Sequence, residues 1–491
     1  MLGEVFLLIF VSMIDWNLIA SQIATLTFDI VYFGAIISTI IVIVLDNRNP
    51  VKTMAWILVL MFLPIVGLIF YFFFGRSQRR VRIIGQKSYD RLMKKPMAEY
   101  LAQDYSELPT AYTRLISFFR ETNQAFPFEG NRVEIYTGGY TKLQALLREL
   151  QKAKRHIHME YYIIENDAIG RMLRDVLIEK AREGVEVRVI YDDVGCWHVP
   201  NHFFEAMREA GIEVRSFLKV RFPLFTSKVN YRNHRKIVVI DGCVGFVGGM
   251  NLAERYMRGF SWGIWRDTHI MMEGKAVHGL QTAFLLDWYF VDRTLITASR
   301  YFPKIETCGN SLAQIVTSEP IGPWKEIMQG MLIAITSAKS YIYIQTPYFL
   351  PTEQILTAMQ TAALSGVDVR LMLPDRADNR LTHLGSCSYL EDVFEAGVKV
   401  YFYKKGFLHA KTMVSDDMLS TVGSTNVDFR SFEHNFEVNA FMYDMETALE
   451  MKEVFLQDQR ECIQIFQKNW VKRSWKQKAA ESVVRLMAPL L

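Results

Sequence analysis

The chain has 491 residues, long enough for several domains and a large buried core. Half of the residues are hydrophobic and 13% are aromatic, a high share for a wholly soluble protein, while the net charge of +4 is too small to indicate a nucleic-acid-binding protein. The cysteines are few, far apart and without a Cys-x2-Cys pair, which argues against a disulfide framework or a zinc site. They are Cys196, Cys243, Cys308, Cys387 and Cys462.

The apolar excess lies at the N-terminus. Residues 54–74 contain no charged side chain over 21 positions. A helix of that length, at about 1.5 Å per residue, crosses a hydrocarbon layer about 30 Å thick. A second apolar stretch covers about 26–45, and the short polar loop between the two stretches holds a turn. The pattern predicts a transmembrane helical hairpin.

An earlier apolar stretch, 5–23, is interrupted by Asp15 and Asn17. It is either a third span or an interfacial helix. It does not resemble a signal peptide, because no Lys or Arg precedes the apolar run. We therefore interpret residues 1–80 as the membrane region.

Basic residues predict the orientation of the hairpin. Four arginines follow the second span at once, whereas the loop between the spans offers only Arg48 and Lys52. The larger cluster is expected to stay in the cytoplasm, and the rest of the chain with it. The four are Arg76, Arg79, Arg80 and Arg82.

From about residue 131 the chain alternates between strands and helices, after a charged connecting segment at 81–130. The periodicity predicts strands at 133–136, 156–164 and 185–191 and helices at 141–153 and 169–183.

The second half of the chain repeats this order. Segment 153–160 resembles 338–345, and the segments beginning at Gly184 and Glu209 resemble those beginning at Gly366 and Glu395. An α/β fold follows, with two tandem βαβ domains at 131–292 and 310–465 related by pseudo-twofold symmetry. A basic tail at 466–491 completes the chain.

Each half carries one copy of a motif with the spacing His-x-Lys-x4-Asp. The copies are His234, Lys236 and Asp241, and His409, Lys411 and Asp416. A turn of the type Gly-small-x-Asn follows each, ending at Asn251 and Asn426, and the copies lie 175 residues apart throughout. Two complete copies in one register do not arise by accident at this composition.

These residue types suit chemistry on a phosphodiester. One imidazole can attack phosphorus while the other protonates the leaving oxygen. Lys236, Lys411, Asn251 and Asn426 can stabilise charge on the non-bridging oxygens, as a metal would elsewhere. We therefore expect no metal and no cofactor. The His-x3-His pair at 198–202 is a weak metal candidate, because Pro200 interrupts it.

The paired motifs resemble those of the phospholipase D superfamily over about residues 130–465. The N-terminal hairpin and the loop at 48–50 are similar to those of bacterial cardiolipin synthases. The resemblance implies a phosphohistidine intermediate without metal, and the conversion of two phosphatidylglycerols to cardiolipin and glycerol. It implies a multi-pass protein of the bacterial inner membrane with cytoplasmic catalytic domains, which binds membrane lipids and no nucleic acid.

The resemblance also implies roles for individual residues. His234 would be the nucleophile and His409 the general acid and then base. Asp241 and Asp416 would complete the catalytic motifs, more as structural residues than as substrate contacts. Gly249 and Ser424 would bind phosphate beside the two asparagines. Asp267 and Glu437, which follow the histidines by 33 and 28 residues, would orient them.

Several alternatives remain open. Water as acceptor would make the protein a phospholipase D, and serine with a CDP-activated lipid would make it a phosphatidylserine synthase. A membrane-anchored nuclease and an inactive lipid-binding scaffold are further alternatives. One incubation with phosphatidylglycerol alone distinguishes transfer, hydrolysis and absence of turnover.

Two segments predict contact with lipid. A loop between the motifs carries basic residues that could attract an anionic lipid, and apolar residues at 217–218 and 222–225 that could dip toward acyl chains. The tail, with Trp470 and Trp475, is either a helix on an anionic membrane surface or one packed on its domain. The basic residues are Lys219, Arg221, Lys228, Arg232 and Arg235.

Overall fold

The structure is a computed structural model, and it describes residues 16–45, 50–71, 111–219 and 231–488. The chain divides into two compact units. Among the described residues, the helices before residue 72 form the first unit, and everything from residue 111 onward belongs to the second.

In the N-terminal unit, α2 (Trp16–Leu45) is one helix of 30 residues. The sequence predicted a segment at 5–23 that is separate from a span at 26–45. Within the described residues this separation is wrong, because one continuous helix includes the end of the first segment and all of the second. Residues 1–15 lie outside the described residues. The stretch Ser21–Leu45 of α2 includes an 18-residue window with a mean hydropathy of 2.5 and is long and apolar enough to cross a membrane.

The predicted single helix over 54–74 is broken. The structure has α3 (Pro50–Phe62) and α4 (Pro64–Phe70), and Leu63 between them leaves the helical conformation with φ −135° and ψ 63°. Proline lacks a backbone N–H and disfavours a helical conformation in the residue before it, so Pro64 explains the break. Residues 72–74 lie outside the described residues. Of the described helices, only α2 has the length and composition of a membrane span.

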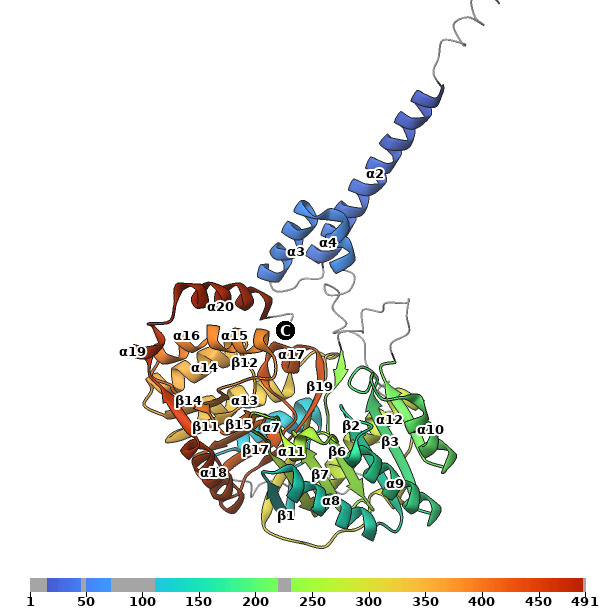
Figure 1. Ribbon diagram of the computed structural model, residues 1–491, viewed down its shortest axis with the longest axis vertical. Helices are drawn as coiled ribbons and strands as arrows, with labels where there is room; N and C mark the ends of the chain where they lie inside the picture. The colour runs from blue at the N-terminus through green and yellow to red at the C-terminus, as the bar shows by residue number, and fades with distance from the viewer. Residues whose placement is uncertain (1–15, 46–49, 72–110, 220–230, 489–491) are drawn as a thin grey trace, which may run out of the picture. The chain divides into compact units, whose positions relative to one another are not determined.

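In the second unit, one sheet of 16 strands runs through both halves of the chain (Figure 1). Strands β1 (Phe128–Tyr136) and β10 (Ser311–Ser318) pair antiparallel and join the halves. Outward from β1 lie β9 (His269–Glu273), β7 (Val244–Gly248), β6 (Ile237–Ile240), β2 (His156–Tyr161), β3 (Glu186–Asp192) and β4 (Glu213–Phe217). Outward from β10 lie β19 (Asn435–Met442), β17 (Leu419–Gly423), β16 (Thr412–Ser415), β11 (Tyr341–Gln345), β13 (Asp368–Pro374), β14 (Lys399–Tyr403) and β20 (Cys462–Ile465).

The two strand orders are equivalent apart from the edge strand β20, as a pseudo-twofold relation requires. Helices cover both faces of the sheet. The long helices α12 (Val277–Asp292) and α18 (Met445–Arg460) share one buried hydrophobic cluster with strands of both halves. Separate clusters form under the helices of the other face. These are α8 (Gly139–Lys152), α9 (Ala168–Arg182) and α10 (Asn201–Glu209) in the first half, and α13 (Glu326–Ser337), α14 (Glu353–Leu364), α15 (Arg380–Ser388) and α16 (Leu390–Glu395) in the second.

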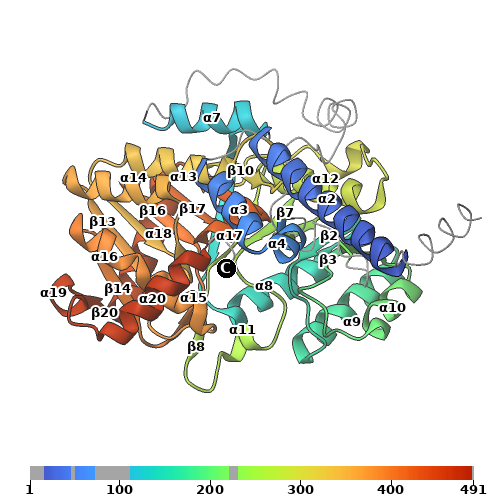
Figure 2. The ribbon, with the colours of Figure 1, turned by 90° about the horizontal axis from the view of Figure 1, so that it is seen from above.

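The helix α7 (Thr113–Asn123) precedes the first half in sequence but packs on the second (Figure 2). Its buried Leu115 and Phe119 join a cluster with Ile327 of α13. Gln314 of β10 donates from Nε2 to the carbonyls of Ile116 and Ala125, at 3.1 and 2.7 Å. The end of the predicted connecting segment is thus part of the second half's core.

The C-terminal tail forms α19 (Gln467–Trp470) and α20 (Trp475–Met487). One face of α20 packs on the domain: Val484 is buried, and Arg485 pairs with Asp392 at 2.7 Å. The opposite face exposes Trp475 and Leu486. The helix therefore buries one face against the domain and exposes apolar side chains on the opposite face.

Candidate active site

Each motif histidine is held by a strand of the opposite half. The short strand β5 (Arg232–Asn233) pairs in parallel with the start of β19, and the His234 N–H donates to the carbonyl of Phe436 at 2.9 Å. Correspondingly, β15 (Gly406–Leu408) pairs with β8 (Ile264–Arg266), and the His409 N–H donates to the carbonyl of Arg266 at 2.7 Å. Two equivalent strand crossings therefore bring the motifs together.

The crossings decide which carboxylate meets which histidine. The Nδ1 atom of His234 lies 3.0 Å from both carboxylate oxygens of Glu437. The Nδ1 atom of His409 lies 2.6 Å from Oδ2 of Asp267. Asp267 and Glu437 do contact the imidazoles, but pairing each with the preceding histidine in sequence was wrong. Each pair joins the two halves.

The lysine of each motif lies close enough to influence the histidine of the opposite motif through its charge. Lys236 Nζ donates to the carbonyl of His234 at 2.6 Å, and Lys411 Nζ donates to the carbonyl of His409. Both amines are buried, and burial lowers the pKa of Lys236 to about 7 and that of Lys411 to about 8. Each lysine also lowers the pKa of the opposite motif's histidine through its charge.

Burial keeps the imidazoles neutral and the carboxylates ionised. Burial, followed by the charge of Lys411, lowers the pKa of His409 to about 3. Burial also lowers the pKa of His234, although Glu437 opposes the shift. For Asp267, burial favours the neutral form, but Lys411 and His409 outweigh it and lower the pKa.

Glu437 behaves in the same way: burial is outweighed by His234 and Lys236, and its pKa is lowered. Each neutral ring then donates from Nδ1 to its carboxylate. Its Nε2 has no partner among the described residues. A lone pair in that position can attack phosphorus or accept a proton.

The motif aspartates bind backbone instead of facing this centre. Asp241 and Asp416 both adopt positive φ, 53° and 51°. Their carboxylates accept backbone N–H groups of residues 154–156 and 339–341, respectively. Their oxygens fix the strand junctions behind the site, which agrees with the expectation that these two residues are structural more than substrate contacts.

Gly249 and Ser424 support the orienting carboxylates. The Gly249 N–H donates to the carbonyl of Thr268, and a Cβ at Gly249 would lie 2.1 Å from Oδ1 of Asp267. Ser424 donates from its hydroxyl to Glu437 Oε2. The Ser424 hydroxyl is thus bonded to a carboxylate and the Gly249 N–H to a carbonyl, and contact of either residue with phosphate stays a prediction.

A matched pair of substitutions tests this assignment. We expect Gly249→Ser to lower kcat by at least about 100-fold, because the new Cβ displaces Asp267 and with it His409. Ser424→Gly removes one hydrogen bond to Glu437 without a steric conflict, and we expect a loss of about tenfold. Steady-state kinetics with a melting temperature for each variant provide the measurement. Equal losses in the two variants would contradict the steric argument.

The two asparagines differ in their surroundings. Asn251 accepts the Ile163 N–H at 3.1 Å and donates to the Tyr256 hydroxyl. Asn426 is buried, with an amide oxygen that has no partner among the described residues. Contact of either one with phosphate stays a prediction.

Aromatic residues that the sequence interpretation missed enclose the histidines. The Tyr162 ring lies 5.1 Å from the ring of His234, and Lys236 Nζ lies 5.4 Å from the same tyrosine ring. Trp265 and Tyr256 lie 5.1 and 6.0 Å from His409. The signal available was position: Tyr162 lies within the strand predicted at 156–164, and it directly follows β2, which pairs with the motif strand β6.

Part of the predicted lipid-attracting surface is buried. Arg235 forms an ion pair with Asp287 at 2.5 Å, and Arg232 is buried as well. Phe217 lies in the core against Phe436. These three residues were wrongly predicted to face lipid, because the strand crossing covers them. Lys219 is exposed; Arg221, Lys228 and 222–225 lie outside the described residues.

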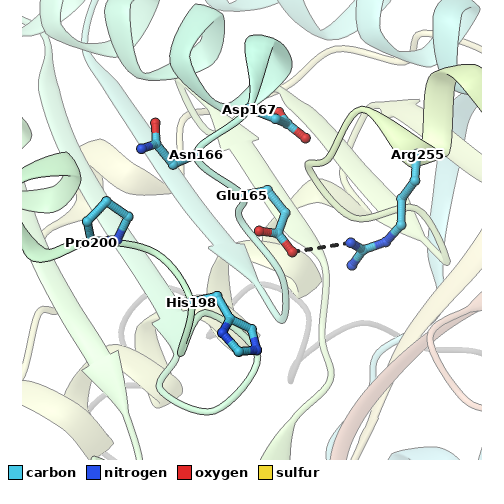
Figure 3. Close-up of a pocket in the computed structure, with 6 residues that line it drawn as sticks. All are labelled: Glu165, Asn166, Asp167, His198, Pro200 and Arg255. Carbon is cyan, nitrogen blue, oxygen red and sulfur yellow. Dashed lines mark hydrogen bonds and ion pairs between the residues drawn. The ribbon is translucent and has the colours of Figure 1, made fainter.

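A polar cavity of about 440 Å³ lies beyond the end of β2 (Figure 3). Its Glu165 and Arg255 form an ion pair at 3.2 Å, and the Glu165 N–H donates to the carbonyl of Leu252, next to Asn251. The cavity also includes His198, one of the weak metal candidates. In the part of the chain that the structure describes, no three His, Cys, Asp or Glu side chains gather as metal ligands would. The lining residues are Glu165, Asn166, Asp167, His198, Pro200 and Arg255.

Comparison with known protein families gives two matches. The family described as "Cardiolipin synthase, PLD-like domain" matches residues 146–267 and 331–459, one segment in each half. The family described as "Phospholipase_D-nuclease N-terminal" matches residues 31–76.

Similar proteins with curated names include a cardiolipin synthase of Geobacillus kaustophilus, 41% identical and covering 94% of each chain. The major cardiolipin synthase of Bacillus subtilis is 38% identical over 96% of this chain and all of that protein. Among solved structures, the phosphatidylserine synthase of Haemophilus influenzae has a TM-score of 0.57 at 14% identity, covering 77% of this chain and 98% of that one, and shares the fold. This chain belongs to the family of bacterial cardiolipin synthases with phospholipase D-like domains.

Proposed function

We propose that the protein is a phosphatidyltransferase that makes cardiolipin and glycerol from two molecules of phosphatidylglycerol. The observation that carries the proposal is the single centre at which two crossed histidine–carboxylate pairs and two buried lysines converge. The relatives named cardiolipin synthases match nearly the whole chain, and they favour phosphatidylglycerol as donor and acceptor.

In the first step, Nε2 of His234 attacks the phosphorus of one phosphatidylglycerol. Binding of the anionic phosphodiester favours uptake of a proton by His409, whose ring is neutral without it. A P–N bond then forms, the P–O bond to glycerol breaks, and the His409 imidazolium gives its proton to the leaving oxygen. Asp267 and the anionic phosphodiester stabilise that imidazolium. Lys236 and Lys411 balance the charge that develops on the non-bridging oxygens.

In the second step, His409 takes the proton from a glycerol hydroxyl of the second phosphatidylglycerol. The hydroxyl oxygen attacks phosphorus, the P–N bond breaks, and cardiolipin leaves with His234 restored. Neither step changes the oxidation state of any atom or calls for a metal.

The membrane arrangement follows the same proposal. The apolar helix α2 and the apolar segment that includes α3 and α4 would form a multi-pass anchor in the bacterial inner membrane, with the catalytic unit on the cytoplasmic side. An anchored enzyme meets two bilayer substrates at a high effective concentration, which suits transfer between lipids. The exposed Trp475 and Leu486 of α20 suit contact with the membrane surface.

The test is turnover of phosphatidylglycerol as the only lipid in detergent micelles, with and without chelator. We expect cardiolipin and glycerol in equal amounts, and no effect of the chelator. Phosphatidic acid with glycerol would instead indicate a hydrolase. Turnover only with CDP-diacylglycerol and serine would indicate a phosphatidylserine synthase, and no lipid turnover would favour a nuclease or a scaffold.

A further inference from the structure

A buried arginine lies behind each histidine–carboxylate pair. Arg235 donates from Nε to the main-chain carbonyl of Glu437 at 3.1 Å. Arg266 donates from Nη1 to the main-chain carbonyl of Asp267 at 2.5 Å. In both cases the carbonyl belongs to the residue whose carboxylate holds a motif histidine. The two guanidinium groups therefore make the same contact, one in each half of the site.

Each arginine also pairs with an aspartate of a long helix. Arg235 pairs with Asp287 of α12 at 2.5 Å, and Arg266 pairs with Asp458 of α18 at 2.7 Å. All four side chains are buried. Breaking a buried pair of this kind costs more than an exposed one, because the remaining charge stays without a partner.

The sequence repeat conceals this equivalence. Arg235 follows its motif histidine, where the second motif has Ala410. Arg266 precedes its orienting carboxylate, where the other half has Phe436. The guanidinium thus comes from the histidine strand in one half and from the carboxylate strand in the other. Because the histidine strand and the carboxylate strand lie side by side at each crossing, an arginine from either strand can reach the main-chain carbonyl of the orienting carboxylate residue.

A third side chain completes each cluster, and here the halves differ. On the Asp458 side, Gln345 of β11 donates from Nε2 to Asp458 at 2.8 Å and accepts from the Thr412 hydroxyl at 2.9 Å. The equivalent residue of β2 is Glu160. One of its oxygens accepts from the Asn233 amide, and the other has no donor among the described residues. Asp287 lies within reach of the Glu160 side chain and raises its pKa.

A carboxylate cannot donate a hydrogen bond to Asp287, but a carboxylic acid can. We propose that Glu160 is a neutral carboxylic acid that donates to Asp287, as Gln345 donates to Asp458, and that the two resulting clusters position the two histidine–carboxylate pairs. The clusters are Arg235–Asp287–Glu160 and Arg266–Asp458–Gln345. Their members are positioning residues, since they act through Glu437 and Asp267.

The charges around Glu160 agree with a neutral acid. Asp287 faces it from α12, and Arg235 already balances Asp287. Glu319, after β10, also lies 3.4 Å from the Arg235 guanidinium. Burial raises the pKa of Glu160 well above its usual value, Asp287 adds to the shift, and Arg235 opposes it. An ionised Glu160 would place a further uncompensated charge in the core.

Steady-state kinetics of three variants test the positioning role. Only the choice of substrate in this assay rests on the proposed function. We expect Glu160→Gln, the residue of the other half, to keep kcat within about twofold. Glu160→Leu and Gln345→Leu should each lower kcat by about 10- to 100-fold with KM nearly unchanged, because the imidazoles lose alignment while the lysines stay in place. Consumption of phosphatidylglycerol is measured, so a hydrolase outcome would contradict the proposed function and leave this test valid.

Infrared spectroscopy tests the proton directly and needs no activity. We expect a carbonyl stretching band of a protonated carboxyl group at neutral pH that is absent in Glu160→Gln. The same band should be retained in the control Glu319→Gln, which removes only the separate contribution of Glu319, a carboxyl whose pKa burial raises to about 7. Loss of the band together with near-normal turnover supports the proposal. If Glu160→Gln removes no such band, or if it is as slow as Glu160→Leu at an unchanged melting temperature, Glu160 is ionised and the proposal is overturned.

Discussion

Replacement of His234 or His409 by alanine is expected to lower phosphatidyl transfer by at least about a thousand-fold. Each ring presents Nε2 without a protein partner among the described residues and is fixed at Nδ1 by a carboxylate of the other half. One ring must form the bond to phosphorus while the other moves the proton, and no described neighbour can take over either role. Steady-state transfer with a melting temperature for each variant gives the measurement.

A phosphodiester with a good leaving group separates the two roles. Such a substrate leaves without being protonated, so it needs the nucleophile but not the general acid. With His234 as nucleophile, His409→Ala should still form the covalent phosphoenzyme from this substrate, and His234→Ala should not. The opposite result would exchange the roles, and phosphoenzyme formation in both variants would contradict the two-histidine mechanism.

The amide variants Asp267→Asn and Glu437→Gln are expected to lower kcat by about 100- to 10,000-fold. Each keeps the shape of its side chain but loses the negative charge that holds the Nδ1 proton, so the imidazole can turn or take the wrong tautomer. Because the strands cross, each substitution impairs the histidine of the opposite half. Glu437→Gln acts on His234, and Asp267→Asn acts on His409.

The same good leaving group tests this crossed pairing. Glu437→Gln should slow formation of the phosphoenzyme as His234→Ala does, whereas Asp267→Asn should leave that step nearly intact and slow only the natural substrate. The Ser424→Gly variant, which removes one hydrogen bond to Glu437, provides a mild control on the same side. If Asp267→Asn abolishes phosphoenzyme formation and Glu437→Gln does not, the carboxylates pair within each half and the described geometry is wrong.

Local patterns in the sequence determined much of this protein. The alternation of apolar residues predicted the strands and helices from 133 to 191, and all five elements are present within a few residues. The repeated motifs predicted His234, Lys236, His409 and Lys411 as the chemical centre, because catalysis on a phosphodiester needs these groups in fixed spacing along a strand. Even the break at Leu63 had a local signal, since Pro64 disfavours helix before it.

The tertiary structure alone decided which residues meet. His234 meets Glu437 because two strands from different halves, β5 and β19, lie side by side. The spacing of residues along the sequence does not predict such a contact. The same holds for α7, which precedes one half and packs on the other, and for Arg235 and Arg266, which reach equivalent places from different strands. The periodicity of apolar residues predicts which side chains share a face of one strand or helix. The packing of distant segments depends on how the surfaces of these elements fit together and bury one another, which only the folded chain shows.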